Sequence, residues 1–269
     1  MSTSMLMNLM DMKNRVAVIT GATGHLGKEF SATLAEMGCD LCLVDRDISA
    51  LEQVAERLRN NHQVQVFSYG CDLENQTARQ KLLEQLKENH DRLNVLVNNA
   101  AFVGDSNIQG WAVDFEEQSL YSWRRAMEVN VTAAFHLSQG LIKKMANSDT
   151  ASIINIGSIY GVNGPDWHLY DGVEMANPAA YAVSKGGLTQ FTRWLATTCA
   201  PEVRVNMISP GGIIRDQDDA FIERYEARTP MARMAKEADF SGALAYLASD
   251  MSRYVTGQNL IVDGGWTVW

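Results

Sequence analysis

The chain has 269 residues, of which 46% are hydrophobic and 20% are charged, with 20 Gly and 5 Pro. This composition is that of a globular protein with a substantial core, and it excludes disordered, collagen-like and low-complexity classes. The formal net charge is −9, and no run of Lys or Arg occurs. Nucleic acid and anionic membranes are therefore not expected as partners, because both require a basic surface.

The termini and cysteines indicate a cytoplasmic protein. No apolar stretch reaches the roughly 20 residues that a membrane span needs. The Met-rich segment 1–15 lacks the cationic start of a signal peptide. Cys39 and Cys42 form a CxxC that runs from a helix end into an apolar strand, the reverse of a redox CxxC, so we expect buried cysteines in a reduced compartment. No metal site is expected, since zinc would need a second pair of ligands.

Short apolar runs alternate with longer amphipathic stretches along the chain. The runs predict strands at 16–20, 41–45, 64–69, 95–98, 152–156, 203–208 and 260–262. Helices are expected at 25–37, 49–60, 76–89, 122–146, 179–199, 218–227 and 236–248, with Ser49 as an N-cap and Gly38 as a C-terminal stop. The alternation predicts an α/β fold: a Rossmann-type, doubly wound parallel sheet with helices on both faces. We expect one domain over 15–269 and an N-terminal extension over 1–14.

A glycine-rich turn follows the first predicted strand and opens the first helix. In Thr20-Gly21-Ala22-Thr23-Gly24-His25-Leu26-Gly27, the glycines permit a tight turn, a close approach to a pyrophosphate and close packing of helix on strand. Asp45 ends the next strand, where a carboxylate accepts hydrogen bonds from ribose hydroxyls and repels a 2′-phosphate. The pattern predicts a dinucleotide site that prefers NAD(H) to NADP(H), with the neighbouring Arg46 as a residue that could soften the preference.

Tyr181 and Lys185 lie four residues apart in a predicted helix and so share a face. A free tyrosine has a pKa of about 10, too high for a base at neutral pH. A nearby ammonium group, together with an oxidised nicotinamide, would lower the pKa of Tyr181.

Several further motifs occur in order along the chain, and together they resemble the short-chain dehydrogenases/reductases over nearly its whole length. Besides the glycine turn and Asp45, the motifs are Cys71-Asp72-Leu73, Asn98-Asn99-Ala100-Ala101, Asn130, Ser158, Tyr181-Ala182-Val183-Ser184-Lys185, Pro210-Gly211, Tyr254-Val255-Thr256-Gly257 and Val262-Asp263-Gly264-Gly265. The resemblance implies hydride transfer between a nicotinamide and a carbinol or carbonyl carbon.

The resemblance also implies roles for individual residues. Tyr181 would be the general acid/base, Lys185 would bind the nicotinamide ribose, and Ser158 would hydrogen-bond the substrate oxygen. Asn130 would hold a water that connects Lys185 to solvent. The cofactor-binding residues implied are Gly21, Thr23, Gly24, His25, Leu26, Gly27, Asp45, Arg46, Asp72, Leu73, Asn99, Ala100, Ala101, Tyr181, Lys185, Pro210, Gly211 and Ile213.

Three of these residues also have purely structural interpretations. Asn130 is equally explained as a hydrogen-bonded polar residue in the core, and Ser158 as an N-cap or turn residue. Asp72 is a candidate cap for the helix that follows the third strand. At the C-terminus, Trp266 and Trp269 are expected at a subunit contact.

The chain departs from the family pattern at three places. His25 stands where glycine is usual, and its side chain is expected to point outward. Arg215 replaces a threonine that usually contacts the nicotinamide carboxamide, and we assign it no role. Ser158 and Tyr181 are separated by 22 residues, more than usual, so segment 164–178 is an insertion. Its aromatic and acidic residues suit either the recognition of a polyol or a contact with a neighbouring subunit.

These observations predict an NAD-dependent oxidoreductase that acts on a secondary alcohol or ketone, with a carbohydrate as one candidate substrate. Segment 213–232 is expected to form a flap over the substrate. Sugar-nucleotide dehydratases or epimerases, and a non-catalytic NAD-binding regulator, are the alternatives. The resemblance implies a homo-oligomer, either a tetramer or a dimer.

Overall fold

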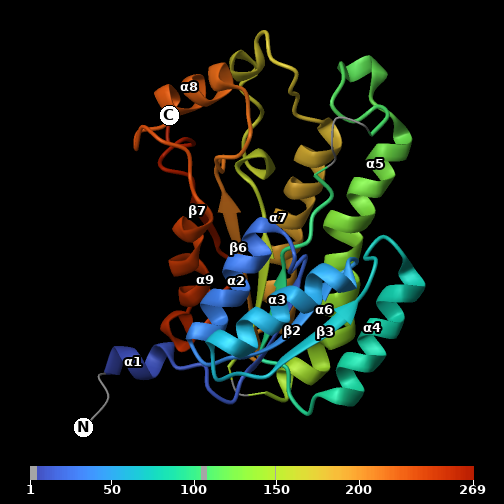
Figure 1. Ribbon diagram of the computed structural model, residues 1–269, viewed down its shortest axis with the longest axis vertical. Helices are drawn as coiled ribbons and strands as arrows, with labels where there is room; N and C mark the ends of the chain where they lie inside the picture. Colours follow the sequence, from blue (N-terminus) through green and yellow to red (C-terminus); the bar gives the residue numbers. More distant parts are fainter. Residues whose placement is uncertain (1–4, 104–107, 149) are drawn as a thin grey trace.

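The computed structural model describes residues 5–103, 108–148 and 150–269, and within them one seven-stranded parallel sheet runs through the molecule (Figure 1). The strand order is β3-β2-β1-β4-β5-β6-β7, which reverses between β1 and β4. The strands are β1 Val16–Thr20, β2 Asp40–Asp45, β3 Val66–Gly70, β4 Val95–Asn98, β5 Ala151–Ile156, β6 Val203–Pro210 and β7 Asn259–Val262. The predicted doubly wound sheet is confirmed.

Helices cover both faces of this sheet (Figure 1). The α-helices are α1 Met5–Met10, α2 His25–Glu36, α3 Ile48–Asn61, α4 Gln76–Asn89, α5 Leu120–Met127, α6 Ala133–Ala146, α7 Ala179–Cys199, α8 Asp219–Arg228 and α9 Ser241–Ala248. Within the described ranges, none of them is both long and apolar enough to cross a lipid bilayer.

The core has two halves because successive strand residues point to opposite faces of the sheet. In β1, Ala17 and Ile19 pack under α2, α3 and α9, whereas Val18 packs under α4, α6 and α7. This two-sided burial explains why the strands are continuous apolar runs rather than alternating ones. Cys39 and Cys42 are fully buried on opposite faces, as expected for small hydrophobic residues.

Some predicted helix termini are wrong. Asp47, and not Ser49, is the N-cap of α3, because its Oδ1 accepts the Ala50 N–H at 3.0 Å. Asn75, and not Asp72, caps α4. The stop at Gly38 is confirmed: its φ is +86° and its N–H is bonded to the Ala35 carbonyl.

Two predicted helices are interrupted. The stretch predicted at 122–146 is broken by a π-helical turn, Glu128–Thr132, between α5 and α6. The stretch predicted at 236–248 begins as the 3-10 helix η5, Glu237–Phe240, before α9. In both cases the predicted segment is helical, but its hydrogen-bond pattern changes along its length.

Candidate active site

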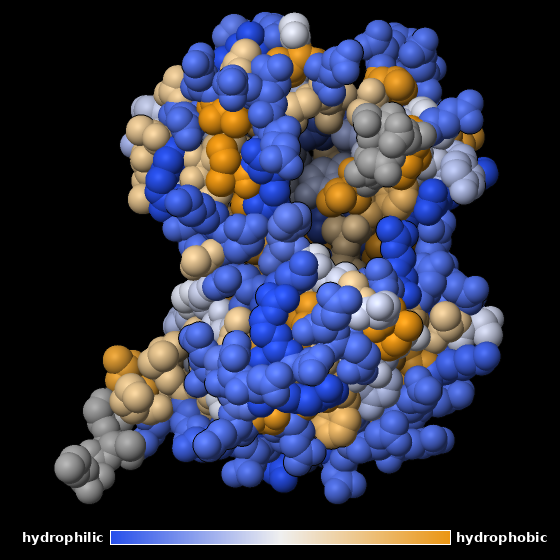
Figure 2. Space-filling model, viewed as in Figure 1, coloured by the Kyte–Doolittle hydropathy of each residue, from blue (hydrophilic) through white to orange (hydrophobic). Residues whose placement is uncertain are grey.

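The candidate residues gather at the carboxyl ends of the strands, next to the point where the strand order reverses. β1 leads into the glycine turn, β4 into Asn99, β5 into Ser158 and β6 into Gly211. The surface is hollowed above α2, between α2 and the end of the molecule that carries α8 (Figure 2). This is where doubly wound sheets bind ligands.

The glycine turn is too crowded for side chains. Gly21 has φ +65°, and a Cβ there would lie 2.8 Å from the Ala100 Cα. A Cβ on Gly27 would lie 2.0 Å from the Gly21 carbonyl oxygen. Gly24 is the N-cap of α2 and supplies no side-chain cap, so the first N–H groups of the helix remain available to a phosphate. The turn therefore fits the pyrophosphate of a dinucleotide.

Asp45 is held close to this turn at the end of β2. Its Oδ2 accepts hydrogen bonds from the Thr23 N–H at 2.9 Å and from the Thr23 hydroxyl at 2.7 Å. Among the described residues, its Oδ1 accepts only the Arg46 N–H, at 2.7 Å. A carboxylate has about four acceptor positions, so Oδ1 retains one for a ribose hydroxyl. The carboxylate thus fits an adenosine ribose, in the orientation that Thr23 fixes.

His25 points outward, as expected, since 71% of its side chain is exposed. Its Nδ1 lies 3.6 Å from Glu237, and Arg215 forms a closer ion pair with the same carboxylate at 2.6 Å. Arg215, for which the sequence predicts no role, therefore connects the start of the predicted flap to η5.

Hydrogen bonds between side chains and the backbone hold the loops on both sides of the predicted cofactor site. Asn99 donates from Nδ2 to the Thr20 and Gly21 carbonyls, at 2.8 and 3.1 Å, which holds the end of β4 against the glycine turn. On the other side, the Gly212 N–H donates to the Tyr225 hydroxyl at 2.5 Å. The predicted residues Asp72, Leu73, Ala100, Ala101, Pro210, Gly211 and Ile213 lie at or just beyond strand ends at this edge.

Tyr181 lies in the first turn of α7, where its hydroxyl is near enough to the Ser158 side chain for the two groups to interact. Burial raises the pKa of Tyr181 above its ordinary value of 10.0, and the interaction with Ser158 offsets only part of this rise. The lowered pKa expected from the sequence is therefore not found in the protein alone. Ser158 is also the N-cap of the 3-10 helix η3, Ile159–Gly161, which confirms its structural interpretation.

Lys185 lies one helical turn after Tyr181 and is 2% exposed. Its Nζ donates to the Ile156 carbonyl at 2.7 Å and lies 5.8 Å from the centroid of the Tyr181 ring. Burial lowers the pKa of Lys185 from 10.5 to about 8. The ammonium group is thus held between β5 and the catalytic candidate Tyr181, in a buried environment that disfavours the charged form of the lysine.

The pKa of Lys185 has a consequence for stability. Between pH 8 and 10.5 the unfolded chain binds a proton at this lysine that the folded chain does not, so stability rises with pH. Wild type should therefore gain about 3 kcal/mol relative to Lys185→Met between neutral pH and pH 10.5. Urea unfolding of both proteins across this pH range measures the difference in their free energies of unfolding. A difference that does not change with pH would contradict the prediction.

Asn130 lies in the π-helical turn and is 2% exposed. Its Oδ1 accepts the Phe102 N–H at 2.6 Å, and its Nδ2 donates to the Ser184 hydroxyl at 2.9 Å. The amide therefore connects the loop after β4 to α7, next to Lys185. Asn130 is a hydrogen-bonded core residue, and one acceptor position of Oδ1 is left for the expected water.

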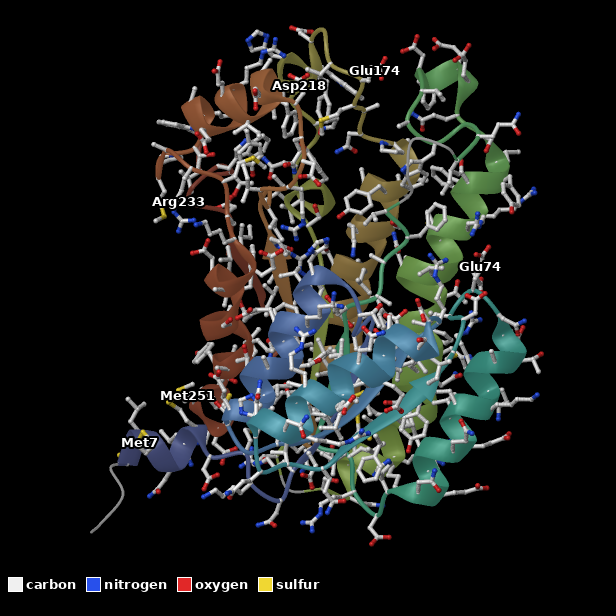
Figure 3. All side chains as sticks on the ribbon, in the orientation of Figure 1. Met7, Glu74, Glu174, Asp218, Arg233 and Met251 are labelled. Carbon is white, nitrogen blue, oxygen red and sulfur yellow. The ribbon has the colours of Figure 1, made fainter. Side chains whose placement is uncertain are left out.

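The insertion lies against α8. Arg224 donates to the Leu169 and Asp171 carbonyls, at 3.3 and 2.6 Å, and Arg228 pairs with Asp166 at 2.8 Å. Glu174 of the insertion and Asp218 at the start of α8 are labelled at the same end of the molecule in Figure 3. The insertion and the predicted flap therefore form one connected wall.

Trp266 is not available to a subunit contact, so this prediction is wrong. Its side chain is 1% exposed and stacks on Tyr225, with ring centroids 5.9 Å apart. Trp269, in contrast, is 71% exposed. The buried indole thus supports the aromatic cluster behind α8.

Sequence reasoning missed Tyr160, Asn177 and Arg79. Tyr160 and Asn177 contact Tyr170 of the insertion. Arg79 is 2% exposed and joins the Leu73 carbonyl to Glu128 of the π-helical turn. The only signal for Tyr160 is its place two residues after Ser158, and neither Asn177 nor Arg79 belongs to a recognisable motif.

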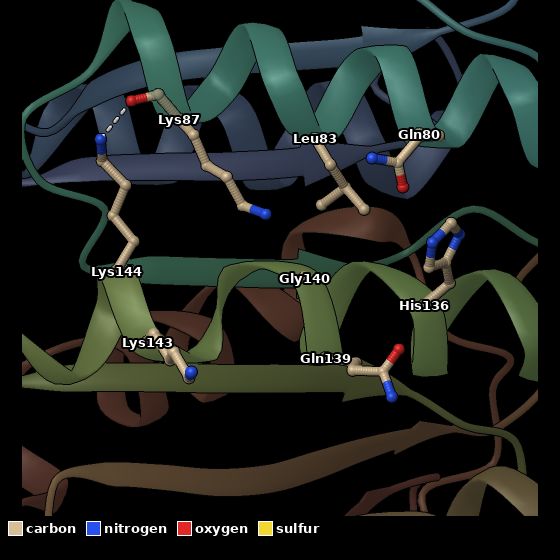
Figure 4. Close-up of a pocket in the computed structure, with 8 residues that line it drawn as sticks. All are labelled: Gln80, Leu83, Lys87, His136, Gln139, Gly140, Lys143 and Lys144. Carbon is tan, nitrogen blue, oxygen red and sulfur yellow. Dashed lines mark hydrogen bonds between the residues drawn. The ribbon is translucent and has the colours of Figure 1, made fainter.

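A separate hollow of about 400 Å³ lies between α4 and α6 (Figure 4). Its charged side chains are Lys87, Lys143 and Lys144, and the Lys144 ammonium donates to the Lys87 carbonyl near the end of α4. None of its lining residues is a candidate catalytic or cofactor-binding residue. Lys144 therefore binds a carbonyl at the end of α4.

Comparison with known proteins agrees with this geometry. A family model described as Enoyl-(Acyl carrier protein) reductase matches residues 21–267. A D-arabinitol 2-dehydrogenase (ribulose-forming) from Candida tropicalis is 31% identical, over 95% of this chain and 93% of its own length. The chain belongs to the short-chain dehydrogenase/reductase family.

Solved structures of short-chain dehydrogenases/reductases share the fold. One from Leptospira borgpetersenii with bound NAD⁺ has a TM-score of 0.84 and 29% identity, covering 99% of this chain and 97% of that one. An NADPH-dependent 3-quinuclidinone reductase from Rhodotorula rubra has a TM-score of 0.86 and 25% identity, covering 100% and 97%. Members of this family bind a nicotinamide cofactor, and the protein is an oxidoreductase acting on alcohols or ketones.

Proposed function

We propose that this short-chain dehydrogenase/reductase is NAD-dependent and acts on a secondary alcohol or ketone of a carbohydrate or sugar derivative. The observation that carries the proposal is the cluster of Tyr181, Ser158 and Lys185 at the strand ends. The Tyr181 hydroxyl interacts with the Ser158 side chain, and the buried Lys185 ammonium, which is bonded to the Ile156 carbonyl, lies 5.8 Å from the Tyr181 ring. When bound beside this cluster, the nicotinamide supplies the hydride acceptor or donor and, when oxidised, a positive charge.

The residues of the chain supply proton transfer and orientation. Tyr181 takes the hydroxyl proton from an alcohol, or gives a proton to a carbonyl oxygen. Ser158 donates a hydrogen bond to the same oxygen and stabilises the charge that develops on it. The Lys185 ammonium group favours the phenolate form of Tyr181. Asn130 positions α7 through Ser184 and contributes to the proposed water site.

We assign the cofactor to the predicted residues around the glycine turn, with NAD preferred because of Asp45. Asp45→Ser is expected to raise kcat/KM for NADP at least tenfold and to lower it for NAD, since the carboxylate that repels a 2′-phosphate is removed. Thr23→Val is the control: it removes one hydrogen bond to Asp45 and keeps the charge. If wild type uses NADP as well as NAD, the assignment is wrong.

The insertion favours a hydroxylated substrate among alcohols, and the D-arabinitol 2-dehydrogenase relative supports this class. A panel of pentitols, hexitols, sugar acids and simple secondary alcohols, followed by cofactor absorbance, tests the proposal. We expect NAD-dependent oxidation of at least one polyol or sugar acid. Turnover only of acyl thioesters, or of no alcohol, would refute it.

We also propose that 15–269 forms one NAD-binding domain, with 1–14 as an extension and with 213–232 and 164–178 as the flap and the substrate-binding insertion.

The free thiols of all four cysteines favour a cytoplasmic protein. Exposed apolar side chains on α6 and α7, Phe135 and Trp194, favour a homo-oligomer.

A further inference from the structure

The insertion places a second tyrosine beside the catalytic cluster. Tyr170 ends the 3-10 helix η4, Trp167–Tyr170, and its hydroxyl lies 2.8 Å from the hydroxyl of Tyr160. The Tyr160 N–H donates to the Ser158 hydroxyl oxygen at 3.2 Å. Tyr160 therefore contacts both groups: its hydroxyl contacts the Tyr170 hydroxyl, and its backbone N–H contacts the Ser158 hydroxyl.

The Tyr170 ring is held in place by neighbours on both sides. Its centroid is 5.7 Å from that of Trp167 in the insertion and 5.4 Å from that of Phe221 in α8. Phe221 is buried, and Arg224 ties the adjacent carbonyls to α8. The hydroxyl is therefore presented at a defined position rather than on a mobile loop.

Asn177 completes this polar group and leaves it with unused hydrogen-bonding capacity. Its side chain lies near enough to both phenol groups to interact with them. Its Oδ1 has no partner among the described residues, although Asn177 is only 6% exposed. Tyr160 and Tyr170 have one O–H group each. One of the two O–H groups donates the hydrogen bond that joins the phenols, and the other has no acceptor among the described hydrogen bonds. One acceptor and one donor remain, which is the complement of an alcohol group.

There is room for a ligand beside these atoms. Tyr170 and Asn177 line a cavity of about 770 Å³ between the insertion, segment 113–118 and the start of α7. This volume is typical of small-molecule sites, about 300–1,000 Å³. Most of the remaining lining is apolar, including Trp167 and Val183. Of the other polar lining residues, Gln118 accepts the Ala179 N–H and Asp171 pairs with His168. Asp114, Tyr170 and Asn177 are therefore the groups that could orient a ligand.

We propose that Tyr170 and Asn177 are specificity-determining residues that bind a hydroxyl group of the substrate beyond the reacting carbinol. The inference rests on the proposed function and deepens it, because it assigns polyol selection to two atoms of the insertion. A polyol satisfies the spare donor and acceptor, whereas an alcohol with a hydrocarbon chain leaves both buried and unpaired, which disfavours it.

Tyr170→Phe tests this, because it removes one hydroxyl and keeps the ring that packs on Phe221. The probes are D-arabinitol and 2-pentanol, which have five carbons each and differ in their additional hydroxyls. For D-arabinitol we expect kcat/KM to fall about tenfold, mainly through KM, as for the loss of a binding interaction present throughout the reaction. For 2-pentanol it should change less than twofold. Tyr254→Phe, at a fully exposed tyrosine, is the matched control.

Asn177→Ala is the second variant and should show the same selectivity. Equal losses for both alcohols in the two variants would indicate a merely structural role and would overturn the inference, as would an unchanged kcat/KM for D-arabinitol. A wild type that oxidises 2-pentanol but no pentitol also overturns it, while the proposed oxidoreductase activity stands. A wild type that oxidises no alcohol refutes the proposed function itself.

Discussion

Replacing Tyr181 by Phe should lower kcat for alcohol oxidation by about 10²–10⁴-fold. The substitution removes a single oxygen, the one that interacts with Ser158, and keeps the ring that packs against the cluster of Trp111, Ala126 and Ala180. The fold and the cofactor affinity should therefore be preserved. Stopped-flow or steady-state absorbance measures turnover, and quenching of tryptophan fluorescence measures the Kd for NAD.

The pH dependence of the wild-type enzyme gives an independent check. Because burial raises the pKa of Tyr181, the protonated phenol dominates at neutral pH in the absence of ligands. In the proposed mechanism, alcohol oxidation needs the Tyr181 phenolate. The kcat/KM for oxidation should therefore rise as the pH increases from 6 to 9, whereas that for ketone reduction should not. A Tyr181→Phe enzyme with more than a tenth of wild-type kcat would remove this residue from its proposed role.

The strands could be read from the sequence because both faces of each strand are buried. Ala17, Val18 and Ile19 are all apolar since they face two cores in turn, and such runs leave little ambiguity about where a strand lies. The observed strands begin or end within two residues of the predicted ones. The glycine turn could also be predicted from the sequence. Its glycines are required because a Cβ at Gly21 or Gly27 would overlap the backbone.

Helix ends and helix type were harder to predict for local reasons. Asp47 and Ser49 are both good N-caps, two residues apart, and only the geometry of the Ala50 N–H decides between them. The hydrophobic pattern does not distinguish the π-helical turn at Glu128–Thr132 from the α-helices on either side of it. It is nevertheless the turn from which Asn130 reaches both Phe102 and Ser184.

The pKa values of the site residues depend on how deeply the fold buries them, and burial of this kind cannot be predicted from the sequence. The spacing of Tyr181 and Lys185 correctly predicts a shared helix face, but the pKa of each residue is governed first by desolvation. The pairing of Tyr160 with Tyr170 depends on the path of an irregular loop, which has no periodicity to read. Trp266 likewise looks the same in sequence whether it packs inside its own chain or against another.

Replacing Gly27 by Ala should have the largest effect on the cofactor site and on stability together. The new Cβ would lie 2.0 Å from the Gly21 carbonyl oxygen, 2.8 Å from the Ala22 Cα and 2.9 Å from the Gly21 carbonyl carbon. All three are backbone atoms, so a side-chain rotation cannot relieve the overlap. Either α2 moves away from β1 or the turn opens, and we expect a loss of about 3 kcal/mol or more in the free energy of unfolding.

Gly242→Ala is the control for this substitution. Gly242 lies in α9, where a Cβ would meet nothing within 4 Å, and alanine should leave stability unchanged or raise it by up to about 1 kcal/mol. Urea unfolding measures both variants, and fluorescence titration measures their Kd for NAD. In the proposed site, α2 can present its N–H groups to the pyrophosphate only when it is packed on β1. Gly27→Ala should therefore weaken NAD binding at least tenfold even where the protein stays folded. Binding at wild-type affinity would show that the turn does not hold the phosphates.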